Sequence, residues 1–357
     1  MANYAERRRL LGSELRKAGV SCLIATSPIT MDYFSGFNEG GGERLMALIL
    51  NQDGEMRLFC PALSVNQARR CGIEDVKGFV DGEDPGPEVK TSGLSGKVAV
   101  DDEMLASILL RFQQWLPTVS FVEGSRIAGQ VMRKKSADEL EHLFRAGAMA
   151  DTAIDKVRGT IKAGETENAV GGRLEAEMKA QGGLPMFAIV AAGANGAEPH
   201  HHTDETLLKS GDVLIMDFGC KTGGYLSDIT RTVAIGEPDP EADKVYQVVY
   251  DAHMAARAAI RPGVTAGSID AAARGVIEAA GYGEYFVHRT GHGLGMRVHE
   301  EPYIMPKSEE MIMEGDVFSI EPGIYLPGRF GVRIENIVTC TADGHASFNV
   351  DPSPVRS

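Results

Sequence analysis

Five residues of types that bind metal ions lie in the second half of the sequence: Asp217, Asp228, His292, Glu321 and Glu335. If strands bring the four carboxylates together, their charges repel strongly unless cations neutralise them. One divalent ion cannot easily use four carboxylates and an imidazole. Two ions about 3.5–4 Å apart can, through bridging carboxylates, and such pairs catalyse hydrolysis. Mixed oxygen and imidazole ligation favours Mn, Co, Fe or Zn over Mg or Ca.

The acidic residues occupy equivalent positions of an internal repeat. The segment Lys209–Gly219 recurs 104 residues later (321 minus 217) as Met313–Gly323, so that Asp217 matches Glu321. Upstream, identical residues recur 99 positions apart, at Arg158 and Arg257, Ile161 and Ile260, Gly164 and Gly263, Thr166 and Thr265, Gly182 and Gly281, and Phe187 and Phe286. These matches indicate a duplicated unit of about 100 residues, each copy reading helix, helix, strand, strand. A duplication predicts a pseudo-twofold site with ligands from both halves.

A simpler explanation exists for each acid taken alone. An acidic residue at a strand end can cap the strand or pair with a nearby arginine, here Arg231 or Arg333. For the whole set, in register with a repeat, a shared metal site is favoured.

Histidines provide further candidates for chemistry. The segment Gly291–Glu300 places His292 and His299 among glycines, which let the backbone approach a ligand closely. We interpret His292 as a metal ligand and His299 as a donor or proton shuttle facing the substrate. His200 lies 99 residues before His299 and supplies a matching histidine from the other half. The neighbours His201 and His202 are expected to be solvated loop residues.

Residues 1–131 alternate helical and strand patterns and predict an α/β domain. Helices are predicted over 4–17, 65–71 and 103–115, strands over 21–25, 45–50 and 56–60, and a surface loop over 81–87. Ser136 and Glu139 form the signature of a capping box that opens a helix through Val157. Residues 132–357 predict an α+β domain, with helices over 167–181, 241–260 and 268–280 outside strands over 187–192, 213–219, 224–235, 317–321 and 333–341.

The composition excludes several classes of protein. The net charge of -14 argues against nucleic acid as a partner, because phosphate binding needs a basic face. No stretch offers about 18 uninterrupted apolar residues, so membrane insertion and export are not expected. Five cysteines without CxxC spacing predict a reducing cytoplasm.

These motifs resemble the pita-bread metallopeptidases of the proline-peptidase branch, which includes prolidases and Xaa-Pro aminopeptidases. The resemblance covers nearly the whole chain. Its pattern is an Asp, a second Asp eleven residues on, a Gly-His-Gly histidine and two glutamates, and all five members are present here. The resemblance implies a pita-bread catalytic domain of duplicated ααββ units after a creatinase/prolidase-type α/β domain, with domains 1–131 and 132–357. The first would control substrate access and dimerisation, so a homodimer is expected.

The resemblance also implies roles for the residues. Two divalent ions (Mn, Co or Zn) would be held by Asp217, Asp228, His292, Glu321 and Glu335, with Asp228 and Glu335 bridging both ions. A bridging hydroxide would attack the scissile carbonyl of a proline-containing peptide, with Glu321 as general base. His299 and His200 would stabilise the tetrahedral intermediate. His288 and Arg333 flank the site as candidate substrate-binding residues, although a salt bridge from Arg333 to a ligand carboxylate explains it equally well.

The substrate length depends on a cation that recognises a free C-terminal carboxylate. Some prolidases carry an arginine shortly after the equivalent of His299, but here Glu301, Pro302 and Tyr303 follow instead. The predicted substitute is Arg44, in a glycine-rich segment of the first domain, or Arg70, from the same chain or from a partner subunit. A solvated charge at the start of a strand explains Arg44 equally well. Hydrolysis of Xaa-Pro dipeptides is the leading interpretation. An Xaa-Pro aminopeptidase that acts on longer peptides, or a non-catalytic pita-bread binding module, remains the alternative.

Overall fold

The computed structural model describes residues 3–352, which form two compact units. The first unit is Met1–Met132 and the second is Arg133–Ser357. Among the described residues, no helix combines the length and the apolar character needed to cross a membrane.

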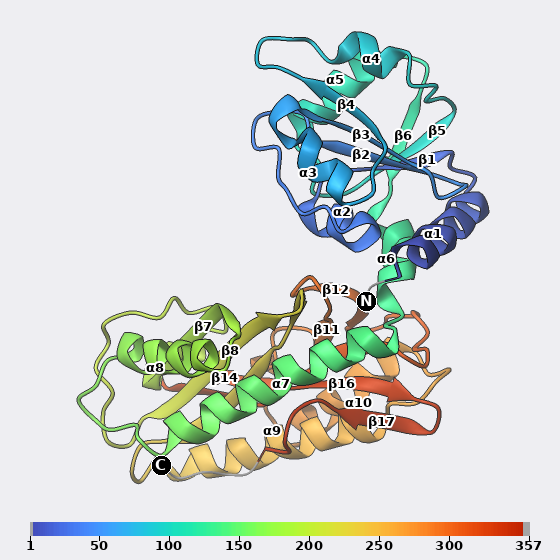
Figure 1. Ribbon diagram of the computed structural model, residues 1–357. Helices are drawn as coiled ribbons and strands as arrows, with labels where there is room; N and C mark the ends of the chain where they lie inside the picture. The colour runs from blue at the N-terminus through green and yellow to red at the C-terminus, as the bar shows by residue number, and fades with distance from the viewer. Residues whose placement is uncertain (1–2, 353–357) are drawn as a thin grey trace. The chain divides into compact units, whose positions relative to one another are not determined.

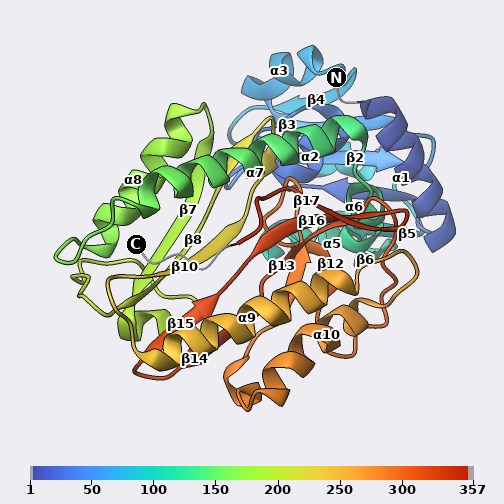
Figure 2. The same ribbon diagram turned by 90° about the horizontal axis from the view of Figure 1, so that it is seen from below.

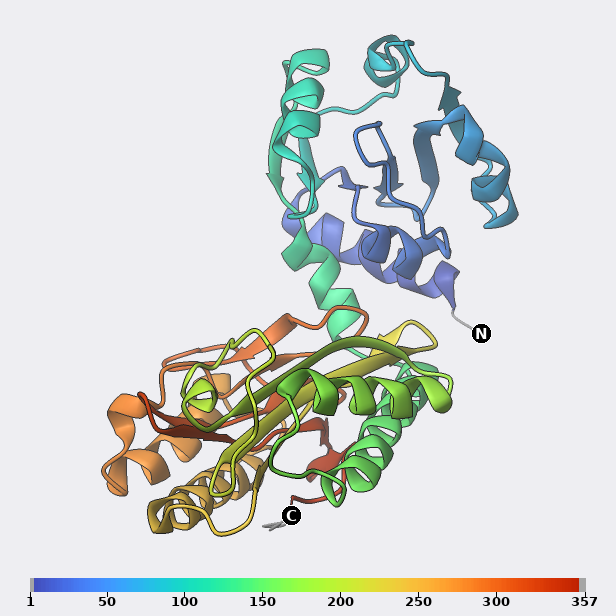
Figure 3. The ribbon, with the colours of Figure 1, turned by 90° about the vertical axis from the view of Figure 1, so that its left-hand side faces the viewer.

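The first unit is built on a mixed six-stranded sheet with the strand order β4-β3-β2-β1-β5-β6. Its strands are β1 (Cys22–Ala25), β2 (Ala47–Asn51), β3 (Met56–Pro61), β4 (Asp75–Phe79), β5 (Lys97–Val100) and β6 (Ser120–Glu123). Helices lie around the sheet (Figures 1 and 3): α1 (Tyr4–Ala18), α2 (Pro28–Ser35), α3 (Val65–Arg70), α4 (Gly86–Lys90), α5 (Ala106–Trp115) and α6 (Ser125–Arg133). Ile108 and Phe112 of α5 pack against Ile24, Ala47 and Val98 of the sheet.

Sequence patterns missed three strands of this sheet. Strands β4 and β6 form its two ends, and their side chains are only partly buried. An edge strand needs no continuous apolar run, because part of it faces water, and its pattern is therefore weak. Strand β5 has only four residues. The predicted loop over 81–87 is confirmed except for its last two residues, which begin α4 at Gly86.

The second unit places helices outside strands, as the α+β prediction states. The helices are α7 (Ala137–Arg158), α8 (Glu167–Ala180), α9 (Pro240–Ala258) and α10 (Ala266–Ala279). The strands are β7 (Leu184–Ala192), β8 (Val213–Thr222), β9 (Tyr225–Leu226), β10 (Ile229–Ala234), β11 (Gly291–Gly293), β12 (Glu300–Ile304), β13 (Val317–Ile320), β14 (Gly323–Leu326), β15 (Phe330–Arg333), β16 (Asn336–Thr341) and β17 (Gly344–Ser347). The capping box of Ser136 and Glu139 is present at the start of α7.

Each half of the second unit has its own apolar core. Residues of α7 and α8 pack on β7, β8 and β10, whereas residues of α9 and α10 pack on β13, β15 and β16. In Figure 2, α7 runs along one side of the strands and α9 and α10 run along the other. The strands of the two halves therefore lie between two layers of helices.

The predicted duplication is visible in equivalent details of the two halves. Thr166 caps α8 and Thr265 caps α10, each with its side-chain oxygen. Thr166 also forms an isolated antiparallel bridge with Leu207, and Thr265 forms the same bridge with Met311. Thr166 and Thr265 are 99 residues apart, and Leu207 and Met311 are 104 residues apart. These are the two offsets of the sequence repeat. The duplicated pita-bread fold is confirmed.

Candidate metal centre

The predicted strands that carry Asp228 and Glu335 are both interrupted at these acids. The expected strand over 224–235 is split into β9 and β10, and the expected strand over 333–341 is split into β15 and β16. Asp228 and Glu335 lie in the gaps and are buried. An isolated bridge, in which Glu335 N donates to Thr230 O at 3.1 Å, joins the two halves there. Because the strand is interrupted at the acid, the acidic side chain need not follow the alternation of a regular strand. Sequence patterns of continuous strands could not predict this interruption.

The five predicted ligands line one cavity of about 630 Å³. Asp217 lies within β8, and Glu321 directly follows β13. Ligand atoms of Asp228, His292 and Glu335 lie within 4.8 Å of one another. His292 Nε2 is 3.3 Å from Glu321 Oε1 and 3.8 Å from Asp228 Oδ2. The two halves of the duplicated fold thus contribute acids to the same small volume.

The electrostatics of this cluster are those of an unneutralised carboxylate group. Burial raises the pKa of Asp228 and of Glu335 well above the usual range, and neighbouring carboxylates raise both further. Burial also raises the pKa of Glu321 to about 7. Because a buried charge is stable only beside an opposite charge, such a cluster of buried acids favours the binding of cations.

The residues fit divalent metal ions. Burial lowers the pKa of His292 to about 3, so its imidazole is neutral. Its Nδ1 lies 3.1 Å from the Gly293 carbonyl, which only accepts, and the proton therefore resides on Nδ1. The lone pair of Nε2 is left for the carboxylates that it faces. Asp217 Oδ1 is buried and has no hydrogen-bond partner among the described residues. A lone pair and an orphaned oxygen among acids are what a cation would satisfy.

Arg333 links two of the acids to the surrounding framework. Its Nη2 donates to Asp217 Oδ2 at 2.6 Å, its Nη1 to Tyr325 Oη at 2.9 Å and its Nε to Thr230 Oγ1 at 3.1 Å. Thr230 in turn donates to Glu335 Oε2 at 2.7 Å. The sequence left two roles open for Arg333, substrate binding and a salt bridge to a ligand carboxylate. The structure contains the salt bridge, and the three guanidinium nitrogens donate to protein groups.

His288 continues the same network away from the acids. Its Nδ1 lies 2.7 Å from the Arg289 carbonyl, and its Nε2 lies 2.8 Å from Tyr325 Oη. Because a carbonyl only accepts, Nδ1 carries the proton and donates to it, and Nε2 accepts from the Tyr325 hydroxyl. Both ring nitrogens are used within the protein, and direct substrate binding by His288 stays a prediction that would require this bond to break. Tyr325 and Thr230 were missed in the sequence, although both lie a few residues from a predicted ligand.

His200 and His299 both line the cavity and are exposed. The ring of His299 lies edge-on to that of His292, with 4.3 Å between the centroids. Burial lowers the pKa of His299, and the positive charge of Arg289 lowers it further. An imidazole N–H beside the acid cluster can donate to an oxygen that gains negative charge.

Glu167, which the sequence patterns did not single out, anchors the loop that carries His200. It is fully buried at the start of α8 and accepts from Ala192 N (2.7 Å), Asn195 Nδ2 (2.9 Å), His201 Nε2 (2.8 Å) and Asp204 N (3.2 Å). His201 is therefore a structural partner of Glu167, not the solvated residue that we expected. A glutamate directly after a helix-capping threonine was the available signal.

Arg44 lies in the first unit and is tied to acids of the same unit. Its Nε and Nη2 donate to the two oxygens of Asp81 at 2.7 and 3.0 Å, and its Nη1 lies 3.0 Å from Glu43. The arrangement is a bidentate surface ion pair, and a role for Arg44 in substrate binding stays a prediction.

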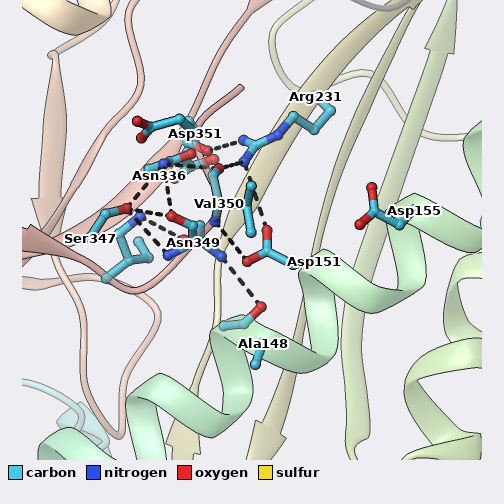
Figure 4. Close-up of polar contacts among 12 residues, drawn as sticks. Ala148, Asp151, Asp155, Arg231, Asn336, Ser347, Asn349, Val350 and Asp351 are labelled. Atoms are coloured by element: carbon cyan, nitrogen blue, oxygen red, sulfur yellow. Dashed lines mark hydrogen bonds and ion pairs between the residues drawn. The ribbon is translucent and has the colours of Figure 1, made fainter. Parts of the chain in front are cut away.

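Arg231 supports the metal cluster through a hydrogen bond to the backbone of one predicted ligand. Its Nη1 donates to the carbonyl of Glu335 at 2.6 Å, and its Nη2 donates to the carbonyl of Val350 at 2.7 Å. Asp151 of α7 accepts from Val350 N at 2.9 Å, and Figure 4 shows Arg231 and Asp151 both directed at Val350. The C-terminal segment is thus fixed between α7 and the strand junction that carries Glu335. Arg231 pairs with the backbone of a ligand, not with its carboxylate.

Removing this support has a predictable cost. In Arg231→Met, the carbonyl oxygens of the buried Glu335 and the exposed Val350 lose a charged donor, and the free energy of unfolding is expected to fall by about 1.5–3 kcal/mol. Loss of a group that orients a ligand should also weaken metal binding roughly 10- to 100-fold. Denaturant titration and calorimetric metal titration measure the two effects. Arg158→Met, which removes a surface partner of Asp155 beside the same segment, should change neither by much. Unchanged metal affinity in Arg231→Met would contradict the positioning role.

Two family models match the chain. Residues 7–131 match the creatinase/prolidase N-terminal domain, and residues 141–342 match metallopeptidase family M24. The chain is 39% identical to the probable dipeptidase PepE of Mycobacterium tuberculosis over 98% of this chain and 95% of that protein. It is 36% identical to the Xaa-Pro dipeptidase of Lactobacillus helveticus over 90% of this chain and 91% of that protein. The solved structure of a prolidase from Thermococcus sibiricus superposes with a TM-score of 0.93 at 34% identity, over 100% of this chain and 99% of that chain. The chain belongs to the M24 metallopeptidases of the proline-peptidase branch, with the pita-bread fold and the creatinase/prolidase-type N-terminal domain.

Proposed function

We propose that this protein is a metal-dependent Xaa-Pro dipeptidase. The observation that carries the proposal is the convergence of five predicted ligands on one cavity, where the pKa values of three carboxylates are raised. Arg333 pairs with Asp217, and no arginine or lysine among residues 3–352 pairs with the other three acids. The full-length similarity to enzymes named dipeptidase, Xaa-Pro dipeptidase and prolidase supports the same substrate class.

Asp217, Asp228, His292, Glu321 and Glu335 would hold two divalent ions, which we propose to be Mn, Co or Zn. When bound, such ions polarise a scissile carbonyl and make water a better nucleophile at neutral pH. The protein supplies the remaining parts. Glu321, whose pKa burial raises to about 7, can take and return a proton near neutral pH. His200 and His299 would donate to the oxygen that becomes negative as the carbonyl carbon turns tetrahedral.

The apolar lining of the cavity suits a proline ring. Phe187, Ile189 and Val298 line the same cavity as the acids. A ring of three methylenes next to the bond to be broken gains from leaving water, whereas a polar side chain would not. The creatinase/prolidase-type domain is proposed to control substrate access and to form a homodimer, and the protein is proposed to act in the cytoplasm.

The substrate length is tested by comparing a dipeptide with a tripeptide. Metal-free protein, given Mn, Co or Zn, should hydrolyse alanyl-proline with a kcat/KM roughly 100-fold above that for alanyl-prolyl-alanine, because the tripeptide lacks a carboxylate at the proline. The readout is release of alanine. Preference for the tripeptide would make the protein an Xaa-Pro aminopeptidase. Failure to cleave either peptide with any of the three metals would leave the non-catalytic binding module.

A further inference from the structure

A dipeptide substrate carries a negative charge of its own into the cavity. Its C-terminal carboxylate lies only a few bonds from the scissile amide, so it enters the same partly buried volume as four protein carboxylates. An anion placed there without a positive partner would be strongly disfavoured. Hydrolysis of dipeptides therefore requires a cation on the cavity wall, beyond the metal ions that the acids themselves would hold.

Two arginines, Arg289 and Arg333, line this cavity among the described residues. The guanidinium of Arg333 is already hydrogen-bonded within the protein, because its three nitrogens donate to Asp217, Tyr325 and Thr230. Its charge is also shared with a carboxylate 2.6 Å away. Two of its five N–H groups remain outside these hydrogen bonds, but a substrate carboxylate would compete with Asp217 for its charge.

His288 and His299 also line the cavity and are weaker candidates for this role than an arginine. Burial lowers the pKa of His288 to about 4, and its two nitrogens are already bonded. The ring of His299 lies edge-on to that of His292, with 4.3 Å between the centroids. An imidazole can add a hydrogen bond to a carboxylate, whereas an arginine also brings a permanent positive charge.

Arg289 has the opposite properties. Its guanidinium makes no hydrogen bond or ion pair within residues 3–352, and it stacks on the ring of Tyr303, with 4.6 Å from its central carbon to the ring centroid. Stacking on an aromatic face holds a guanidinium in one orientation and leaves its edge donors available. Tyr303 lies in the segment directly after His299, which contains no arginine in this chain.

The backbone around Arg289 is held rigidly. Thr290 donates through its N and Oγ1 to Asp270 of α10 at 3.3 and 2.8 Å. Arg274 of the same helix donates to the carbonyls of Phe286 and His288, both at 3.0 Å. Both sides of Arg289 are thus fixed to one helix, so its side chain starts from a defined place, which lowers the entropic cost of binding an anion.

We propose that Arg289, oriented by Tyr303, binds the C-terminal carboxylate of the substrate and makes this enzyme specific for dipeptides. The inference rests on the proposed function and names the residue that selects the substrate. It also moves the carboxylate clamp from Arg44 of the first unit to the catalytic unit itself. A guanidinium edge can make two parallel bonds to a carboxylate, which an ammonium cannot.

The test compares alanyl-proline with its C-terminal amide, alanyl-prolinamide, which keeps the scissile bond and removes the charge. Steady-state kinetics are measured for wild type, Arg289→Gln, Arg289→Lys and Tyr303→Leu, all loaded with the same metal. Wild type should prefer the acid. In Arg289→Gln, KM for the acid should rise roughly 10- to 100-fold, and the preference for acid over amide should be lost. Arg289→Lys should recover part of the preference, and Tyr303→Leu should lose a smaller part.

Arg329→Gln is the matched control, because Arg329 is an exposed arginine of the same unit that pairs with Asp239 and Glu241. It should keep the wild-type ratio. The melting temperature of each variant separates lost binding from lost folding, and the ratio of the two substrates is independent of the fraction of active enzyme. If wild type cleaves both substrates and Arg289→Gln keeps the preference for the acid, the assignment of Arg289 is wrong while the peptidase proposal stands. If wild type cleaves neither, both fail.

Discussion

Replacing Asp228 by asparagine is expected to abolish metal-dependent hydrolysis of alanyl-proline, with kcat/KM falling by at least about 10³-fold. Asp228 is buried in the gap between β9 and β10 and faces both His292 and Glu335. An amide has the same shape but offers one acceptor oxygen and no negative charge, so it cannot share two cations. The metal content, measured by mass spectrometry after dialysis, should fall from two ions per chain to one or none.

Asp155→Asn is the control for this variant. Asp155 is an exposed acid of α7 that pairs with Arg158, and its substitution also removes one charge. It should keep two ions and wild-type activity. Retention of two ions by Asp228→Asn, with activity within about tenfold of wild type, would refute the bridging role.

The metal-free protein is expected to lose stability as the pH rises from about 5 to 8. The folded-state pKa values of Asp228, Glu335 and Glu321 are raised, so the folded protein binds these protons more tightly than the unfolded chain does. The stabilisation is complete below the unfolded carboxyl pKa, about 4–4.5, and is lost as the pH passes through the folded values. For Glu321, a shift from 4.5 to about 7 corresponds to a loss on the order of 3 kcal/mol.

Denaturant titrations of chelated protein at pH 5, 6, 7 and 8 measure this loss. Adding a divalent metal at pH 8 should restore stability, because the ions bind the folded state and replace the missing protons. Chelated Asp228→Asn should lose less stability than chelated wild type across the same range, since one of the repelling charges is gone. A metal-free protein equally stable at pH 5 and pH 8 would show that the cluster is neutralised in some other way.

The residues proposed to form the site could be identified from the sequence alone. The repeat placed Asp217 and Glu321 in register, and its offsets of 99 and 104 residues recur in the paired bridges of Thr166 and Thr265. Local signals also predicted the capping box of Ser136 and the long helices, because capping and helical periodicity depend on residues a few positions apart. Patterns of this kind failed for the edge strands β4 and β6, where part of the strand faces water.

The support and orientation of the site depend on contacts between residues that are far apart in the sequence. Arg333 reaches Asp217 across 116 residues of sequence, and Arg231 reaches the Glu335 carbonyl across 104. The interruptions of the strands at Asp228 and Glu335, and the stacking of Arg289 on Tyr303, likewise follow from where the two halves meet. Such contacts depend on side-chain directions after the strands have paired, and no local pattern of residues encodes those directions.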